Sequence, residues 1–212
     1  REKSGIPIVV HMMDLAASGG YMVAMAGDRI YAQPTTLTGS IGVISIYPDL
    51  EGLTGKIGVK MRVIKSGPVK DIGSIWRAFT SEERDILQQI TNEYYRHFVE
   101  TVVRGRPELS RSRIEELADG RVYTAQQALE AGLIDGVGHL PDTLKQARAL
   151  AGIRDAAVVT YKRPYEFSEN IYSSSGAKTP ESDAASQVGL VNIDARGVSA
   201  LPGPGFYYLW LP

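Results

Sequence analysis

One serine of this sequence occupies a place where a nucleophile can be presented. Ser18 follows an apolar run at residues 6–13, precedes Gly19 and Gly20, and is followed by a second apolar run at 21–27. The first run is typical of a buried strand and the second of the first turns of a helix, so Ser18 should lie at a sharp strand-to-helix turn. Its small neighbours would leave the hydroxyl unshielded. The amide of Gly19, at the helix start, is placed to stabilise an oxyanion.

The same residues also have a simpler interpretation. Ser18 is a typical helix N-cap, and the glycines would then only permit the turn. Local sequence by itself favours capping, because capping serines far outnumber catalytic ones. A catalytic role for Ser18 therefore depends on a base elsewhere in the chain.

Histidine is a scarce source of such a base. The chain holds His11, His97 and His139, and none has an evident acidic partner in the sequence. A Ser-His-Asp triad that uses His11 near Ser18 is one alternative, but His11 lies on the expected buried strand.

Lysine is the other candidate base. Lys65 and Lys70 lie in a loop with glycine and proline, after a strand-like segment at 59–64, and loops at strand ends commonly carry catalytic groups. A lysine accepts a proton only when its amine is neutral, which requires a pKa about three units below the usual value. Burial beside Ser18 and away from carboxylates would favour the neutral amine. The alternative for either lysine is an exposed, solvated ammonium.

Four ordered blocks within about the first 140 residues carry a family resemblance. They are Ala17-Ser18-Gly19-Gly20-Tyr21, Pro34-Thr35-Thr36-Leu37-Thr38-Gly39-Ser40-Ile41-Gly42-Val43, Ile64-Lys65-Ser66-Gly67-Pro68-Val69-Lys70-Asp71-Ile72, and Ala118-Asp119-Gly120-Arg121-Val122-Tyr123 followed by Gly132-Leu133-Ile134-Asp135. Their order and spacing make chance agreement a poor explanation. Together they resemble signal peptide peptidase A, the protease IV group of Ser-Lys peptidases.

The resemblance implies roles for individual residues. Ser18 would be the nucleophile and Lys70, the second lysine of its loop, the general base. By the same matching, Ser40 would hydrogen-bond the Lys70 amine and hold it in position, whereas Lys65 has no catalytic role. We expect Asp71 to point away from Lys70, because a carboxylate in contact would favour the charged amine.

The resemblance also implies the reaction, which is the cleavage of leftover signal peptides and similar apolar peptides at a membrane. Ser18 would attack the carbonyl and Gly19 would contribute one oxyanion amide. The substrate would bind extended by strand addition, with small apolar side chains entering pockets lined by residues such as Ile41 and Val43. This chemistry requires no cofactor and no metal.

The implied fold is a Clp/crotonase-like α/β domain, and the alternating patterns of the chain agree with it. We expect residues 1–164 to form this domain and 165–212 to form a flexible tail, because the composition beyond Pro164 shifts to Ser, Gly, Asn, Asp and Pro. The aromatic segment Phe206–Leu211 ends the tail. We expect it to dock on its own subunit or on a neighbour, with a membrane or partner contact as the alternative.

Hydrophobic periodicity and capping residues predict the individual elements. The expected strands are 6–13, 29–32, 41–47, 59–64 and 156–161, and the expected helices are one from 21, then 49–56, 81–103, a short one capped by Ser110 or Ser112 and ending at 117, 125–131 capped by Thr124, and 142–151.

Composition limits the class of protein without identifying it. The 212 residues, 43% of them hydrophobic, carry a formal net charge of −1, which gives no basic excess for nucleic acid. The absence of cysteine excludes disulfides, and three dispersed histidines argue against a catalytic metal. No apolar run reaches 18 residues, so the sequence as given predicts no membrane span.

The resemblance sets expectations for the larger protein. The family carries a membrane-anchoring helix and a Pro-Gly-Gly-type loop upstream of the serine strand, so we expect this chain to be the catalytic half of a membrane-associated protein on the periplasmic side. The serine and lysine of one site are implied to come from adjacent copies of the fold. The active form would then be a ring-like homo-oligomer that binds peptides.

Two other functions are compatible with the same fold. One is a non-catalytic scaffold that uses the groove only to bind peptides. The other is a crotonase-type acyl-CoA enzyme, suggested because a helix ending in Ala131-Gly132-Leu133-Ile134-Asp135 also resembles the wider Clp/crotonase superfamily. The chain shows no evident adenine or phosphate site, which argues against the acyl-CoA enzyme.

Overall fold

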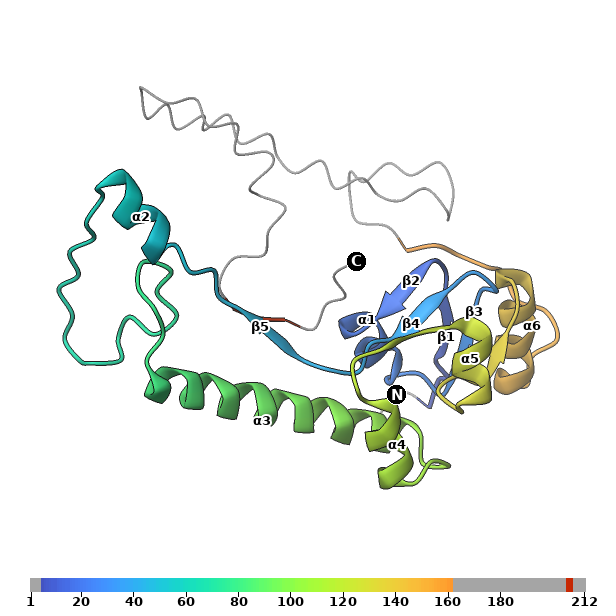
Figure 1. The fold of residues 1–212 in the computed structure, drawn as a ribbon. Coiled ribbons are helices and arrows are strands. Elements are labelled where there is room, and N and C mark those ends of the chain that lie inside the picture. Colours follow the sequence, from blue (N-terminus) through green and yellow to red (C-terminus); the bar gives the residue numbers. More distant parts are fainter. Residues whose placement is uncertain (1–4, 162–204, 208–212) are drawn as a thin grey trace, which may run out of the picture. The chain divides into compact units, whose positions relative to one another are not determined.

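A computed structural model describes residues 5–161 and 205–207 of the chain (Figure 1). The chain divides into two units, one of residues 1–153 with 202–212 and one of residues 154–201. The described residues of the second unit, 154–161, form neither helix nor strand. The expected tail at 165–212 lies outside the described residues except for 205–207.

The helices and strands of the described ranges all belong to the first unit. The strands are β1 (Val9–Met12), β2 (Leu15–Ala17), β3 (Arg29–Ala32), β4 (Leu37–Gly39), β5 (Ile44–Ile46), β6 (Val122–Thr124), β7 (Gly136–Val137) and β8 (Gly205–Tyr207). The helices are α1 (Gly19–Ala24), α2 (Glu51–Ile57), α3 (Ser81–Gly105), α4 (Arg111–Leu117), α5 (Ala125–Glu130) and α6 (Leu140–Ala151).

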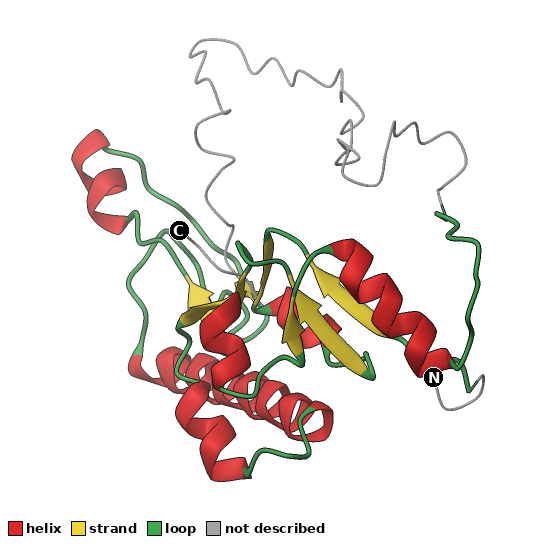
Figure 2. Ribbon diagram, turned by 90° about the vertical axis from the view of Figure 1, so that its right-hand side faces the viewer, coloured by secondary structure: helices red, strands yellow, loops and turns green. Residues whose placement is uncertain are grey.

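Small sheets and the helices around them make this unit an α/β fold (Figure 2). One sheet has the strand order β1-β3-β7 and another β2-β4-β6, while β5 pairs with β8. The β1–β3 and β2–β4 pairs are parallel and the β4–β6 pair is antiparallel. Parallel neighbours need a crossover, which β2 and α1 provide between β1 and β3.

The core joins α1 to the C-terminal half of α3. Tyr21 of α1 and Phe98 and Val102 of α3 are fully buried in one hydrophobic cluster. The Tyr21 hydroxyl donates a hydrogen bond to the carbonyl of Leu133, 2.7 Å away, so the one polar atom of this buried ring is satisfied. Burial of each large apolar side chain contributes about 2 kcal/mol, and this cluster therefore fixes α1 against α3.

Capping explains why α3 begins where the sequence predicts. The Thr80 side chain accepts from the Glu83 amide, and the Glu83 side chain accepts from the Thr80 amide at 2.9 Å, which is a capping box. The same arrangement of Thr124 and Gln127 opens α5, and Ser110 caps α4. These helix starts confirm the predictions made from capping residues.

Four predicted strands differ from the structure, and the one predicted at 41–47 forms β5 only over Ile44–Ile46. The apolar run at 6–13 forms β1 only to Met12, and a second strand, β2, carries the chain on to Ser18. The segment 59–64 is not a strand, and its side chains are exposed. The segment 156–161 is not a strand either. A strand needs a partner for its amides and carbonyls, and neither segment has one in the described part of this chain.

The long helix α3 separates two regions of the unit. The two three-stranded sheets lie toward its C-terminal end. Strand β5 leads away from them to α2 and the loop 58–79, which lie toward the N-terminal end of α3 (Figure 1). No helix among the described residues is both long and apolar enough to cross a bilayer.

Candidate active site

Ser18 has an unusual backbone conformation. It follows β2 directly and precedes α1, with φ 51° and ψ −113°. Residues other than glycine rarely adopt a positive φ, and holding one there costs on the order of 1–3 kcal/mol. The residue is also buried, at 1% exposure. Such strain persists only where the surrounding structure enforces it, and it is concentrated at functional sites.

The hydroxyl of Ser18 does not cap α1. Ser18 stands at the N-cap position, but its side chain makes no capping hydrogen bond. The simpler interpretation of the sequence, in which Ser18 serves the helix as a cap, is therefore wrong. The hydroxyl is left for another use.

Strand β4 supplies the support that holds Ser18. The Ser18 amide donates to the Gly39 carbonyl at 2.7 Å, and the Ser18 carbonyl accepts from the Met22 amide at 2.9 Å. Gly39 itself has φ +76°, and a Cβ there would lie 2.4 Å from the ring of Tyr123. Glycine at this position therefore lets β4 lie against Tyr123 of β6 while its carbonyl holds the serine.

Ser40 occupies the matching position after β4. The parallel register pairs Ala17 with Gly39, which brings Ser18 and Ser40 next to each other at the carboxyl ends of neighbouring strands. Ser40 also has a positive φ, 49°, and its amide donates to the Arg121 carbonyl at 2.8 Å. The two serines are the non-glycine residues of positive φ among those described. The sequence shows both serines but not their shared strain or register.

Gly19 is the first residue of α1. The amides of the first helical turn have no acceptor within the helix, so this amide is available next to the Ser18 hydroxyl. The geometry is compatible with the expected oxyanion donor.

A cavity of about 460 Å³ opens beside Ser40. Val43 lines it, as expected, but Ile41 does not, because the Ile41 side chain is fully buried in the hydrophobic core. The prediction that Ile41 lines a substrate pocket is therefore corrected. The sequence analysis missed the opposite wall, which is the polar face of α3 formed by Gln88, Thr91, Asn92 and Tyr95.

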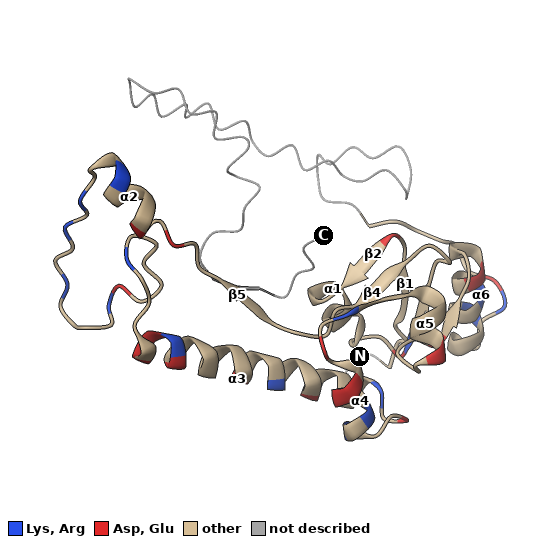
Figure 3. Cartoon of the chain, in the orientation of Figure 1, with Lys and Arg blue, Asp and Glu red and all other residues tan. Residues whose placement is uncertain are grey.

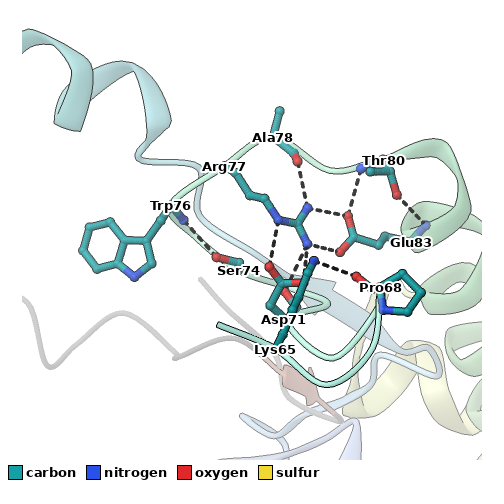
Figure 4. Close-up of polar contacts among 9 residues, drawn as sticks. All are labelled: Lys65, Pro68, Asp71, Ser74, Trp76, Arg77, Ala78, Thr80 and Glu83. Atoms are coloured by element: carbon teal, nitrogen blue, oxygen red, sulfur yellow. Dashed lines mark hydrogen bonds and ion pairs between the residues drawn. The ribbon is translucent and has the colours of Figure 1, made fainter. Parts of the chain in front are cut away.

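Lys70 lies in a different setting. It is an exposed residue of the loop 58–79, and its ammonium makes no hydrogen bond or ion pair within the described part of the chain. Lys65 instead donates to the Asp71 carboxylate at 2.7 Å, and Arg77 holds the same carboxylate (Figure 4). Asp71 thus contacts Lys65 and Arg77, which confirms the expectation that it points away from Lys70.

A single chain does not bring Ser18 and Lys70 together. Helix α1 packs on the C-terminal end of α3, where Met25 contacts Gly105, while the lysine loop is tied to the first turn of α3 at Glu83. The Ser40 end of the serine region also faces Gln88 and Thr91 of α3, across a cavity. Among the described residues, no hydrogen bond or ion pair joins Lys70 to Ser18.

The histidine alternative is not supported by the geometry. The Nδ1 atom of His11 lies 2.8 Å from the Thr143 hydroxyl, on the side of β1 that faces α6. Its Nε2 atom is buried with no hydrogen-bond partner, and burial lowers the pKa of the ring. No hydrogen bond joins His11 to Ser18 among the described residues, so a triad is not formed.

Comparisons with known proteins find related peptidases. The sequence profile of peptidase family S49 matches residues 1–154. A putative signal peptide peptidase SppA of Enterococcus faecium is 35% identical over 98% of this chain and 60% of its own length. A putative protease of Synechocystis is 46% identical over 70% of this chain and 53% of its own length. The chloroplastic serine protease SPPA of Arabidopsis thaliana is 36% identical over 81% of this chain and 26% of its own length.

These relatives are longer than the region that matches. The chain spans 60% of the Enterococcus relative and 53% of the Synechocystis relative. The matched part includes both serines and the lysine loop, because the family profile extends from residue 1 to residue 154.

Proposed function

Because the chain belongs to peptidase family S49, we propose that it hydrolyses peptides with Ser18 as nucleophile and Lys70 as general base. The observation that carries the proposal is the strained, buried and uncapped Ser18, next in register to Ser40. A hydroxyl fixed beside free helix amides suits acyl transfer better than it suits a structural role.

In the proposed reaction, the Ser18 Oγ attacks the carbonyl carbon of the peptide and its proton passes to the Lys70 amine. The Gly19 amide donates to the oxyanion that forms. The carbon–nitrogen bond then breaks, and the Lys70 ammonium gives its proton to the leaving amine. Water hydrolyses the acyl-serine by the same proton transfers in reverse.

The proposed site is shared between copies of the chain. Within the described part of one chain, Lys70 makes no hydrogen bond or ion pair with Ser18, and in this proposal it comes from an adjacent copy in a homo-oligomer. The exposed segment 59–64, which has the alternation of a strand and no partner among the described residues, is suited to contact that copy. In this proposal, the Ser40 hydroxyl forms a hydrogen bond with the amine of Lys70 from the adjacent copy and so orients it.

Substrates are proposed to be extended peptides with small apolar side chains. Strand β5 already pairs with β8 along one edge, which supports strand addition as the mode of binding. The cavity lined by Val43 lies directly before β5, so it can take a side chain of the bound peptide. The name of the Enterococcus relative, a putative signal peptide peptidase, extends the proposal to signal peptides. From the resemblance of the four sequence blocks, we further propose a Clp/crotonase-like fold that acts at a membrane, on the periplasmic side.

The test uses the full-length protein that contains this chain. A fluorophosphonate probe should label wild-type protein at Ser18, and Ser18→Ala should lose both labelling and peptide hydrolysis. Ser112→Ala, an exposed serine of α4, is the matched control and should keep both. A protein that binds peptides but is neither labelled nor hydrolytic would be the scaffold instead, and would contradict the proposal.

A further inference from the structure

The loop that carries Lys70 is closed by one guanidinium. The Arg77 Nε and Nη2 atoms donate to the two carboxylate oxygens of Asp71, at 3.1 and 2.9 Å. The Nη1 atom donates to Glu83 Oε2 at 2.7 Å, and Nη2 also reaches Glu83 Oε1 (Figure 4). Arg77 therefore joins the residue next to Lys70 with the first turn of α3. Two-pronged arginine–carboxylate contacts fix orientation as well as distance.

Hydrogen bonds of Lys65 and Glu83 extend this arrangement in both directions along the chain. Lys65 Nζ donates to the Pro68 carbonyl and to Asp71, both at 2.7 Å, and so closes the turn that precedes Lys70. Glu83 Oε2 accepts from the Thr80 amide in the capping box of α3. The loop is thus attached to a helix terminus that the core holds at its other end.

The charges of the arrangement balance. Two cations, Lys65 and Arg77, face two carboxylates, Asp71 and Glu83. The Arg77 guanidinium lowers the pKa of Glu83 to about 2 and lowers the pKa of Asp71 as well, so both are ionised at neutral pH. The Glu83 side chain is 2% exposed and that of Asp71 15%, which limits screening by solvent.

Other charged groups lie close to the loop. Glu51 of α2 accepts from the Ala78 amide at 3.1 Å, and Asp49 and Arg84 line a cavity that Arg77 also lines. The loop itself carries further Lys and Arg, Lys60 and Arg62 (Figure 3). Asp71 is the acidic residue next to Lys70 in the chain. Its carboxylate forms ion pairs with Arg77 and Lys65.

We propose that Arg77 is a positioning residue for Lys70. Its guanidinium, a fork that contacts Asp71 and Glu83 together, holds the loop on α3 and keeps the Asp71 carboxylate away from the lysine amine. This inference rests on the proposed function. Without the fork, Asp71 becomes the nearest anion to Lys70 and favours its charged form. The base would then be available only at higher pH.

The test compares Arg77→Met with wild type in the full-length protein, using the pH dependence of kcat/KM. A carboxylate released next to the base is expected to move the acid limb up by about one pH unit. Turnover at neutral pH then falls about tenfold, while KM changes little because substrate contacts are kept. Adding Asp71→Asn to Arg77→Met should move the limb back, whereas adding Glu83→Gln should not.

Controls separate this effect from a loss of stability. Arg113→Met removes an arginine ion pair on α4, 2.8 Å from Glu116, and should leave the limb in place. If Arg77→Met does not fold, Arg77→Lys keeps the positive charge but loses the fork, and an upward shift of the limb is still expected. The inference would be overturned if the acid limb of the kcat/KM profile did not move in a folded Arg77 variant. It would also be overturned if Asp71→Asn did not move the limb back toward its wild-type pH. If Lys70→Ala keeps wild-type turnover, the proposed function itself fails.

Discussion

The region around Ser18 and the region around Lys70 are built in opposite ways. Ser18 is buried, held by backbone hydrogen bonds from β4, and surrounded by a dense core. Lys70 is exposed, and its loop is held by ion pairs to the end of a helix. Backbone contacts within one chain hold the serine region, whereas ion pairs around Asp71 hold the lysine loop. Under the proposed function, this difference means that folding prepares the nucleophile and assembly brings in the base.

The largest effect should come from removing either reacting group. Ser18→Ala and Lys70→Ala should each lower turnover by about 10⁴-fold or more without unfolding the protein, since each breaks the same proton transfer. The double variant should be no worse than either single one. Peptide hydrolysis by the full-length protein measures this. Loss of activity in Lys65→Ala together with normal turnover in Lys70→Ala would show that the base is assigned to the wrong lysine.

Two glycines of nearly equal φ allow the stability of the two regions to be compared. Gly39 (φ +76°) lies against Tyr123, whereas Gly58 (φ +75°), at the end of α2, has nothing within 4 Å of an added Cβ. Gly58→Ala should cost only the backbone strain of about 1 kcal/mol. Gly39→Ala should cost about 3 kcal/mol, because overpacking adds to the strain. Thermal unfolding measures both, and equal losses would mean that the serine region is no more tightly packed than the lysine region.

Ser40 tests how the two regions meet. Ser40→Ala removes the hydrogen bond proposed to orient the incoming lysine, so turnover should fall about tenfold while fluorophosphonate labelling of Ser18 persists at a lower rate. Ser112→Ala is again the matched control. A rate unchanged across the pH range would remove Ser40 from the site.

The ion pairs of the lysine region should make its stability depend on pH. Arg77 lowers the pKa of Glu83 from 4.5 to about 2, so the carboxylate stabilises the fold fully above pH 4.5. This contribution is lost as the pH falls toward 2. Glu83→Gln should therefore lower Tm by about 5 °C at neutral pH, and this difference from wild type should shrink below pH 4.5. A difference that stays constant down to pH 2.5 would contradict the pairing.

Local patterns predicted the helices well, because capping and periodicity act over a few residues. Thr124 caps the helix that the sequence assigns to it, and Ser110, one of two candidates, caps α4. The family resemblance placed Ser18 and Ser40 in one site, and the parallel register of β2 and β4 shows how they meet. Their positive φ values depend on contacts between distant segments, which no local pattern encodes.

The failures have the same cause. The segment 59–64 has the composition of a strand, but a strand forms only where another strand pairs with it. Ile41 was expected in a substrate pocket, yet its side chain is fully buried in the core, and burial depends on segments far away in the sequence. The fork of Arg77 joins residues six apart in both directions, and no pattern in the sequence pointed to it.

Mixing two inactive variants tests the central claim most directly. Full-length Ser18→Ala retains Lys70, and Lys70→Ala retains Ser18, so a mixed oligomer contains some sites with both groups intact. If each site is shared between copies, random mixing of equal amounts should restore about a quarter of wild-type hydrolysis. If serine and lysine act within one chain, the mixture should be as inactive as its parts, which would contradict the account.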